Sequence, residues 1–252
     1  MTKIILNGCN GKMGQVITRL AGEDESLSVV AGFDISNNKE NEYSVFTSPD
    51  DFDGEADVVI DFSHPDSLEG ILSFCKKKKL PVIVCTTGLS NSQKNIMEAA
   101  SKEIPVFFSA NMSLGINLLI DLAKKATALL SENYDIEIIE KHHNQKIDAP
   151  SGTALAIADA ISEDMKDSAE YVYDRHISRK KRKKSEIGIH AVRGGTIVGE
   201  HTVLFAGTDE VIEIKHSAAS KEIFAVGALK AAKFMNGKSA GMYSMNDLIR
   251  EI

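Results

Sequence analysis

Five short apolar segments alternate with helix-forming segments over the first 110 residues, and this alternation restricts the fold more than any other feature of the chain. Strands are predicted at 3–7, 28–33, 57–61, 81–85 and 105–109. Helices are predicted at about 12–22, 65–75 and 91–103. Strands separated by helices in this way predict a parallel, doubly wound sheet, whose ligands bind at the carboxyl ends of the strands.

Three glycines follow the first predicted strand. Gly8, Gly11 and Gly14 are spaced G-x-x-G-x-x-G, not G-x-G-x-x-G, so the motif alone is a weak signal. It still predicts a tight turn into a helix whose first N–H groups can hold a pyrophosphate. The second strand ends at Asp34, where a carboxylate can accept hydrogen bonds from an adenosine ribose. With that acid in place, the pattern favours a dinucleotide site over a simple glycine turn.

Small or polar residues also follow the other strand ends, in segments 61–64, 85–88 and 109–112. Ordinary loop chemistry would explain any one of them, but together they can line a cofactor. The predicted cofactor-binding residues are Gly8, Cys9, Asn10, Gly11, Lys12, Met13, Asp34, Phe62, Cys85, Thr86, Thr87, Ser109, Ala110, Asn111 and Met112.

The pattern changes after residue 112. Residues 113–131 carry the apolar stripe of a long helix, and strands are predicted at 187–193, 196–206 and 211–218. The Gly194-Gly195 link predicts an antiparallel hairpin between the first two of these strands. We therefore expect a second, α+β domain built on a mostly antiparallel sheet. Residues 221–235 return to a helix with an Ala-rich face, and that helix or the tail after it is expected to pack on the first domain.

The segment 142–154 carries the densest chemistry. His142 and His143 follow a predicted strand, so their side chains are expected to point to opposite faces, and one of them can face a given substrate atom. Histidine donates protons near neutral pH. A solvated polar turn is the plainer interpretation of a His-His pair, but Lys146 and the helix start after it favour a functional site.

The helix start itself is readable. Pro150 ends the preceding segment, Ser151 is a good N-cap, and the next residues form helix strongly. The amides of Gly152 and Thr153 then lie at the positive end of the helix dipole, where a carboxylate fits.

Composition excludes several classes. A net charge of −7 argues against a nucleic-acid-binding protein, and no apolar run is long enough to span a membrane. Three separated cysteines without a CxxC motif indicate reduced thiols in a cytoplasm and no zinc site, so no metal is expected. The run 179–184 consists of six cations and is expected to be a solvated loop, with enrichment of anionic ligands as the functional alternative.

These motifs resemble the dihydrodipicolinate reductase family over nearly the whole chain. The most specific markers are Glu140-x-His142-His143-x-x-Lys146-x-Asp148-Ala149-Pro150-Ser151-Gly152-Thr153-Ala154 and Arg193-x-Gly195 followed by Ile197-Val198-Gly199-Glu200-His201. The glycine set, Asp61-Phe62-Ser63, Thr86-Thr87-Gly88 and Ala110-Asn111 also match. The histidine segment is highly specific to the family, whereas the glycine turn is shared by many folds.

The resemblance implies a Rossmann-type cofactor domain of residues 1–112 completed by 222–252, a substrate-binding and oligomerisation domain of 113–221, and a homotetramer. It implies reduction of 4-hydroxy-tetrahydrodipicolinate to tetrahydrodipicolinate in diaminopimelate and lysine synthesis, with NADH and/or NADPH. By position, His142 is the proton donor, and Lys146 assists protonation or holds a carboxylate. His143, Ser151, Gly152 and Thr153 would bind this small dicarboxylate substrate.

Three positions depart from the family pattern. Cys85 stands where glycine is common, Ile35 where some members carry an arginine for the NADP phosphate, and Lys221 where arginine occurs near the interdomain hinge. A short-chain dehydrogenase would need Tyr-x-x-x-Lys, which is absent from the sequence. The alternative function is a non-catalytic NAD(P)(H) sensor on the same fold, which would not need His142, Lys146 and the helix start together.

Overall fold

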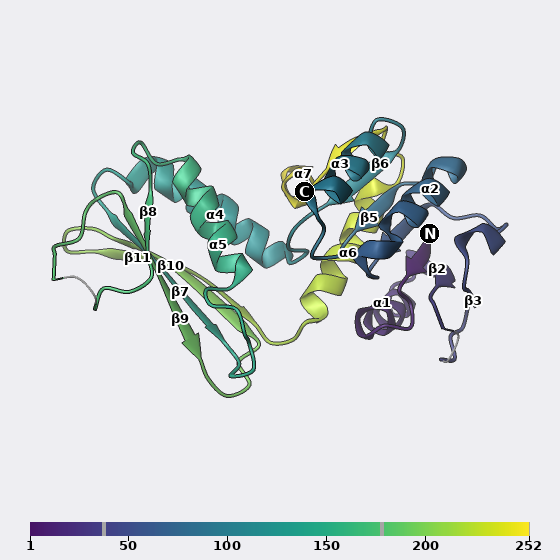
Figure 1. Cartoon of the computed structure of the whole chain (residues 1–252), viewed down its shortest axis with the longest axis horizontal. Helices are drawn as coiled ribbons and strands as arrows, with labels where there is room; N and C mark the ends of the chain where they lie inside the picture. The colour runs from purple at the N-terminus through teal and green to yellow at the C-terminus, as the bar shows by residue number, and fades with distance from the viewer. Residues whose placement is uncertain (37–38, 177–178, 252) are drawn as a thin grey trace. The chain divides into compact units, whose positions relative to one another are not determined.

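The computed structural model describes residues 1–36, 39–176 and 179–251 and divides into two compact units. The first unit combines Met1–Leu114 with Glu222–Ile252, and the second is Gly115–Lys221. The yellow-green and yellow C-terminal elements accordingly lie among the purple and blue elements of the N-terminal half (Figure 1).

The first unit is built on a seven-stranded sheet in which all neighbouring strands are parallel. Its strands are β1 (Thr2–Asn7), β2 (Leu27–Phe33), β3 (Ser44–Phe46), β4 (Val58–Asp61), β5 (Val82–Val84), β6 (Pro105–Phe108) and β12 (Gly241–Tyr243). Their order is β12-β6-β5-β4-β1-β2-β3, so the chain reverses direction across the sheet between β1 and β4. The predicted Rossmann-type, doubly wound sheet is confirmed.

Helices cover both faces of this sheet. They are α1 (Lys12–Gly22), α2 (Leu68–Lys78), α3 (Asn91–Ala100), α6 (Glu222–Met235) and α7 (Met245–Glu251), with short 3-10 turns at Pro49–Asp51 and Pro65–Ser67. Side chains alternate along each strand, so Ile4 and Leu6 pack with α1 and α6, whereas Ile5 packs with α2 and α3. A capping box formed by Ser90 and Gln93 starts α3.

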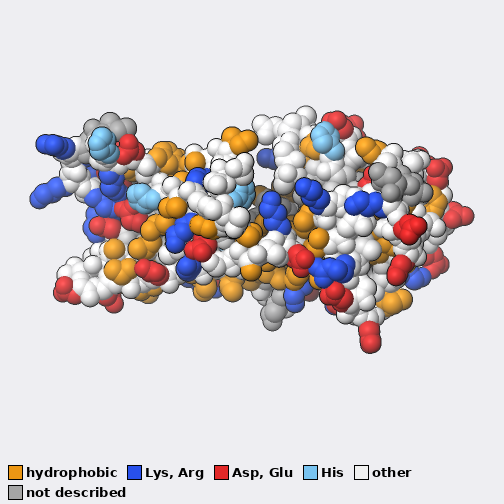
Figure 2. All heavy atoms as spheres, turned by 90° about the horizontal axis from the view of Figure 1, so that it is seen from below, with side chains coloured by type: hydrophobic (Ala, Val, Ile, Leu, Met, Phe, Trp, Pro, Cys, Tyr) orange, Lys and Arg blue, Asp and Glu red, His pale blue; other side chains and the backbone are white. Residues whose placement is uncertain are grey.

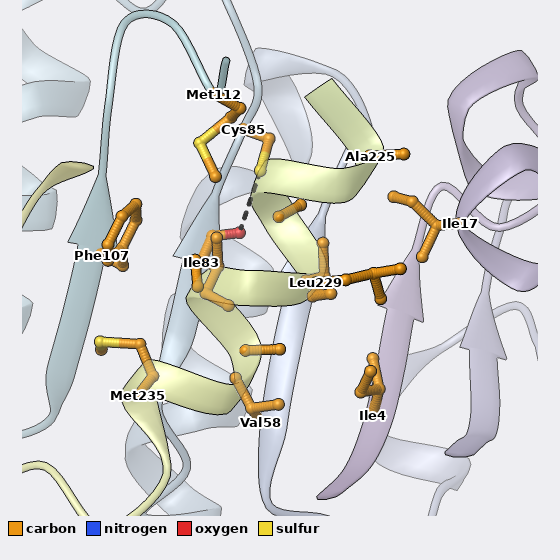
Figure 3. Packing of buried hydrophobic residues seen from close by; sticks show 14 of the residues in the cluster. Ile4, Ile17, Val58, Ile83, Cys85, Phe107, Met112, Ala225, Leu229 and Met235 are labelled. Carbon is orange, nitrogen blue, oxygen red and sulfur yellow. Dashed lines mark hydrogen bonds between the residues drawn. The ribbon is translucent and has the colours of Figure 1, made fainter. Parts of the chain in front are cut away.

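The C-terminal segment completes the first core, as expected from its Ala-rich helix. Ala225, Leu229 and Met235 of α6 pack against Ile4, Val58, Ile83 and Phe107 of the sheet (Figure 3). A Cβ at Gly227 would lie 1.7 Å from the carbonyl oxygen of Met112, so only glycine permits this approach. The edge strands β3 and β12 were not predicted, because three-residue strands carry too little periodicity to read.

The glycine turn lies where the chain reverses. Gly8 has a φ of +81°, and a Cβ there would lie 2.5 Å from the carbonyl oxygen of Phe62, just after β4. A Cβ at Gly14 would lie 2.3 Å from the carbonyl oxygen of Gly8. These two positions therefore require glycine, and α1 begins with no side-chain cap over its first amides.

The second unit has a five-stranded sheet covered by two helices. Its elements are α4 (Leu114–Leu130), β7 (Asp135–His142), α5 (Gly152–Glu163), β8 (Glu170–Val172), β9 (Glu186–Arg193), β10 (Gly199–Ala206) and β11 (Val211–Ala218). Ile136 and Ile138 of β7 and Val203 and Phe205 of β10 pack against α4 and α5. Glu137 and Ile139 therefore point to the opposite face.

This second sheet is mixed, in the order β11-β10-β7-β9-β8, with two antiparallel and two parallel neighbour pairs. The second α+β domain is confirmed, but its sheet is less antiparallel than expected. The predicted hairpin across Gly194 and Gly195 is wrong, because β7 lies between β9 and β10. The chain crosses through α5 before it forms β9, which makes β9 parallel to β7 and leaves the other edge of β7 to β10.

The basic run 179–184 is a loop that is exposed apart from Arg182, as expected, and several of its cations pair with acidic side chains of the second sheet. Arg182 is only 16% exposed and donates to Asp135 and Glu137. Lys183 pairs with Glu170, and Lys184 pairs with Asp135. At the left end of Figure 2, blue and red side chains are correspondingly interleaved.

None of the helices in the described part of the chain is long and apolar enough to cross a membrane.

Candidate active site

A cavity of about 410 Å³ opens at the carboxyl edge of the first sheet. Its lining includes Gly8 and Gly11 of the glycine turn, Asp34 and Ile35 after β2, and Phe62 after β4. The structure thus brings the predicted glycine turn, the acid and the β4 loop together. His64, from the segment expected to line a cofactor, also lines the cavity, as do Thr47, Pro49 and Asp66, which were not predicted.

Asp34 is tied to the glycine turn. Its Oδ2 accepts the backbone N–H of Asn10 at 2.9 Å, and its Oδ1 accepts the N–H of Ser36 at 3.3 Å. Each carboxylate oxygen keeps one lone pair for a further donor, such as a ribose hydroxyl. The neighbouring Ile35 is 98% exposed and brings no charge to this position.

A buried polar cluster lies beneath this edge and was not predicted. The Asp61 carboxylate, fully buried at the end of β4, accepts hydrogen bonds from Asn7 at 2.8 Å, Thr86 at 2.8 Å and Ser63. Burial raises the pKa of the Asp61 carboxyl, and these hydrogen bonds oppose that shift. The cluster fixes the loops after β1, β4 and β5 relative to one another. An acid at the end of an apolar strand was the available sequence signal.

Several predicted cofactor residues turn their side chains into the protein. Cys9, Cys85 and Met112 belong to the apolar core of the first unit. Figure 3 shows Cys85 and Met112 there, with the Cys85 thiol directed to the Ile83 carbonyl. Only their backbone groups remain for a cofactor. Asn111 accepts the N–H of Ser113 through its side chain and so shapes its own loop.

In the second unit, one buried carboxylate joins three elements. Glu140 on β7 is fully buried and makes a bidentate pair with Arg193 on β9, with both N···O distances 2.7 Å. Its Oε2 lies 2.6 Å from Nδ1 of His142, and its Oε1 accepts the Ser151 N–H at 3.0 Å. Burial alone would raise the pKa of the Glu140 carboxyl, but hydrogen bonds from Arg193, His142 and Ser151 hold it below its ordinary value.

His142 is mostly buried among other imidazoles. Its side chain is 11% exposed, and its ring packs edge-on against His201 of β10 with 5.2 Å between centroids. His201 is 4% exposed, and its Nε2 lies 3.0 Å from Ser151 Oγ. Burial, reinforced by the nearby His142, lowers the pKa of His201 to about 4, so this ring is neutral at pH 7. A Cβ at Gly199 would approach Nε2 of His142 to 3.0 Å.

His143 has different surroundings. It lines a shallow cavity of about 330 Å³ with Gly195, Thr196, Val198 and Lys221. Lys146 forms an ion pair with Asp148 at 2.8 Å, which lowers the pKa of the Asp148 carboxyl. A ligand carboxylate binding Lys146 would therefore compete with Asp148.

The start of α5 has the expected form. Ser151 caps the helix by accepting the Ala154 N–H at 3.1 Å. A Cβ at Gly152 would meet nothing within 4 Å, so internal packing does not require glycine at this first helical position. The open space leaves room for an anionic group close to the backbone.

Glu140, Arg193, His201 and Asp148 were not predicted as site residues. All four stand within the motifs that carry the family resemblance, so the signal was present in the sequence. Their joint role depends on the strand order β10-β7-β9, which the predicted hairpin had excluded. In the described part of the chain, no group of three or more His, Cys, Asp or Glu residues could hold a metal ion.

The Rossmann-type sheet and the imidazole–carboxylate cluster define a two-domain oxidoreductase whose fold implies a nicotinamide cofactor. Family models described as dihydrodipicolinate reductase, N-terminus and C-terminus, match residues 2–112 and 115–249. The chain belongs to the dihydrodipicolinate reductase family.

Full-length relatives agree with this assignment. The 4-hydroxy-tetrahydrodipicolinate reductase of Clostridium novyi (strain NT) is 53% identical over 250 residues, which cover 99% of each chain. The enzyme of the same name from Caldanaerobacter subterraneus subsp. tengcongensis is 54% identical over 251 residues, covering 100% of this chain and 99% of the relative. In fold, the chain resembles dipicolinate-bound dihydrodipicolinate reductase from Paenisporosarcina sp. TG-14, with a TM-score of 0.83 at 23% identity and coverage of 98% and 99%.

Proposed function

We propose that this protein catalyses the NAD(P)H-dependent reduction of 4-hydroxy-tetrahydrodipicolinate to tetrahydrodipicolinate in diaminopimelate and lysine synthesis. The full-length identity to relatives of that name supports the assignment. The structural observation that carries it is the Glu140 carboxylate, which joins a proton-donating imidazole to a helix start suited to a substrate carboxylate. A non-catalytic dinucleotide sensor would have no use for this arrangement.

The protein's residues must supply a proton and bind two carboxylates. Loss of water from the 4-hydroxy substrate creates an unsaturated carbon conjugated with the imine, and a bound reduced nicotinamide would supply the hydride that adds to it. The resulting enamine needs a proton, and His142 is the side chain that we assign to deliver it. Lys146 and the amides of Gly152 and Thr153 would hold the carboxylates, and His143 would contact the substrate from its own cavity.

The first unit offers a seat for the dinucleotide. The uncapped start of α1, with the backbone of residues 8–13, would hold the pyrophosphate, and Asp34 would accept hydrogen bonds from the adenosine ribose. The close approaches at Gly8 and Gly14 fit this use, because any Cβ would fill the turn. We assign contacts with the rest of the cofactor to Phe62, Cys85, Thr86, Thr87 and residues 109–112.

Because of Asp34, we expect the protein to use NADH at least as well as NADPH. Its carboxylate accepts hydrogen bonds from the ribose 2′-hydroxyl and repels a 2′-phosphate, while Ile35 adds no charge. Lys12 and Lys39 can soften the repulsion, so both cofactors are expected to work. The ratio of kcat/KM values for NADH and NADPH at matched ionic strength tests this, and Ile35→Arg should move the ratio towards NADPH. An unchanged ratio in that variant would show that the ribose lies elsewhere.

The second unit would bind substrate and assemble the oligomer. One face of its sheet is covered by α4 and α5, while Val192 and Val211 on the other face are 44% and 57% exposed. We propose that this face forms the homotetramer, which light scattering after size-exclusion chromatography would test. A monomer across micromolar concentrations would contradict it. The cytoplasmic location stays a prediction.

A coupled assay tests the reaction. The purified protein is mixed with the upstream synthase, pyruvate and aspartate-semialdehyde, and NADH absorbance is followed. We expect oxidation that requires both the synthase and this protein. Cofactor binding without any oxidation would instead support the sensor.

A further inference from the structure

The Glu140 carboxylate makes more hydrogen bonds than a simple buried ion pair with Arg193 would need. Arg193 satisfies both carboxylate oxygens, Oε2 is shared with His142 Nδ1, and Oε1 is shared with the Ser151 amide. Arg193 also donates to the backbone carbonyl of Asp148 at 2.6 Å. One carboxylate–guanidinium pair thus contacts the imidazole, the start of α5 and the loop that carries Lys146.

We propose that Glu140, braced by Arg193, is the positioning residue of this reductase: it fixes the proton-donating tautomer of His142 and sets that ring against the start of α5. The proposal rests on the function proposed above. Neither residue needs to touch the substrate, because both act through groups that do.

The chemistry follows from the shared Nδ1. A carboxylate beside Nδ1 keeps a proton on that nitrogen, so Nε2 is the atom that gives up and regains a proton. The same carboxylate stabilises the charged imidazolium before it donates. Arg193 keeps Glu140 ionised in spite of its burial, because a bidentate guanidinium favours the charged carboxylate. Removing the carboxylate would leave both the tautomer and the charge of His142 unsupported.

Other titratable groups surround His142, and they define what a pH profile can report. Glu140 lies beside it on β7, Arg193 on β9 and His201 on β10, His216 of β11 lies next to His201, and Lys146 and Asp148 belong to the following loop. His201 and His216 have pKa values lowered mainly by burial and stay neutral at neutral pH. The carboxylate of Glu140 is therefore the nearest negative charge to the ring.

The chain contains a matched control on the same strand. Glu137 also bonds an imidazole, His190, at 2.8 Å, and an arginine, Arg175, at 2.7 Å. It points to the opposite face of β7, away from the start of α5. Glu137→Gln therefore disturbs an equivalent carboxylate–imidazole–arginine group away from the proposed chemistry, and because this group lies on the face proposed for the homotetramer, the oligomeric state of the variant is checked beside its kcat.

The kinetic test compares Glu140→Gln with Glu137→Gln. For Glu140→Gln we expect kcat to fall by about 10²-fold or more, while the affinity for NADH changes less than about twofold. The pH above which kcat declines should also move down, because the imidazolium has lost a charge-assisted hydrogen bond. Glu137→Gln should keep both kcat and the pH profile. Glu140→Gln with near-normal kcat and an unshifted profile would overturn the proposal.

A second measurement does not depend on turnover. Histidine ¹⁵N–¹H correlation spectra of the full-length protein, with His142 assigned by its loss in His142→Gln, report which ring nitrogen carries the proton. We expect the Nδ1–H tautomer in the wild type and a mixture in Arg193→Met, which keeps Glu140 but removes its brace. A wild-type Nε2–H tautomer would overturn the proposal even if Glu140→Gln failed to fold. Absence of turnover in the wild type, with the expected tautomer, would instead contradict the proposed reaction.

Discussion

Protonation of the buried His201 should destabilise this protein in mild acid. The ring is 4% exposed, its Nδ1 has no hydrogen-bond partner among the described residues, and burial lowers its pKa from 6.5 to about 4. An unfolded chain takes up a proton at His201 near pH 6.5, whereas the folded protein does so only near pH 4. The unfolded state therefore binds more protons in this window, and stability is lost as the pH falls through it.

The size of the effect follows from those two pKa values. At 1.36 kcal/mol per pH unit, the full difference corresponds to about 3 kcal/mol, of which about 2 kcal/mol is lost by pH 5. His216, whose pKa is also lowered by burial, contributes in the same direction. Glu140 adds its own loss at lower pH, because its folded pKa lies below the ordinary carboxyl value.

Urea unfolding followed by circular dichroism at pH 7.5, 6.5, 5.5 and 5 measures the effect. His201→Gln keeps a polar atom near Ser151 Oγ but cannot be protonated. When the pH is lowered from 7.5 to 5, the free energy of unfolding of this variant should decrease by about 2 kcal/mol less than that of the wild type. His64→Gln is the control, because the side chain of His64 is 75% exposed. Parallel pH dependences for His201→Gln and wild type would refute the reasoning.

Three further predictions concern the proposed substrate site. His142→Gln should lower kcat by roughly 10²- to 10⁴-fold with a smaller change in KM, whereas His143→Gln should act mainly on KM. Steady-state kinetics separate these two effects. A His142→Gln variant that keeps most of its kcat would show that His142 does not transfer the proton. Lys146→Ala should weaken competitive inhibition by pyridine-2,6-dicarboxylate, and an unchanged inhibition constant would place the carboxylate site elsewhere. Gly152→Ala should keep or slightly raise the melting temperature, because the added Cβ meets nothing within 4 Å. The same substitution should raise KM. An unchanged KM would show that no ligand approaches this amide.

Local chemistry explains why much of the first unit could be predicted. The five principal strands are short, apolar and largely buried, so their runs stand out from the helices between them. Gly14 is required by a contact with Gly8 in the same β–α turn, and Gly8 by its positive φ, so their spacing was informative even though the close approach of Phe62 to Gly8 comes from another loop. Likewise, Ser151 and the residues after it begin α5 because capping is a local interaction.

The order of the strands in the second sheet could not be predicted from local chemistry. Periodicity identified β9, β10 and β11, but strand order depends on which strands pair after the chain has crossed through α5. The Gly-Gly link was therefore misinterpreted as a hairpin, whereas the antiparallel neighbours along the chain are β10 and β11. The basic run shows the same limit, because the acidic partners of Arg182 lie 45 and 47 residues away.

The sequence by itself thus determined the longer helices and most of the longer strands, the cofactor-type turn and the imidazole–lysine–helix segment, since each depends mainly on residues close in the chain. Only the tertiary structure decided that Arg193, 53 residues from Glu140, would hold its carboxylate, and that His201, 50 residues from Ser151, would lie against His142. The physical reason is that a buried charge is tolerated only where separate strands bring its partners together, and pairing between distant strands leaves no local pattern in the chain.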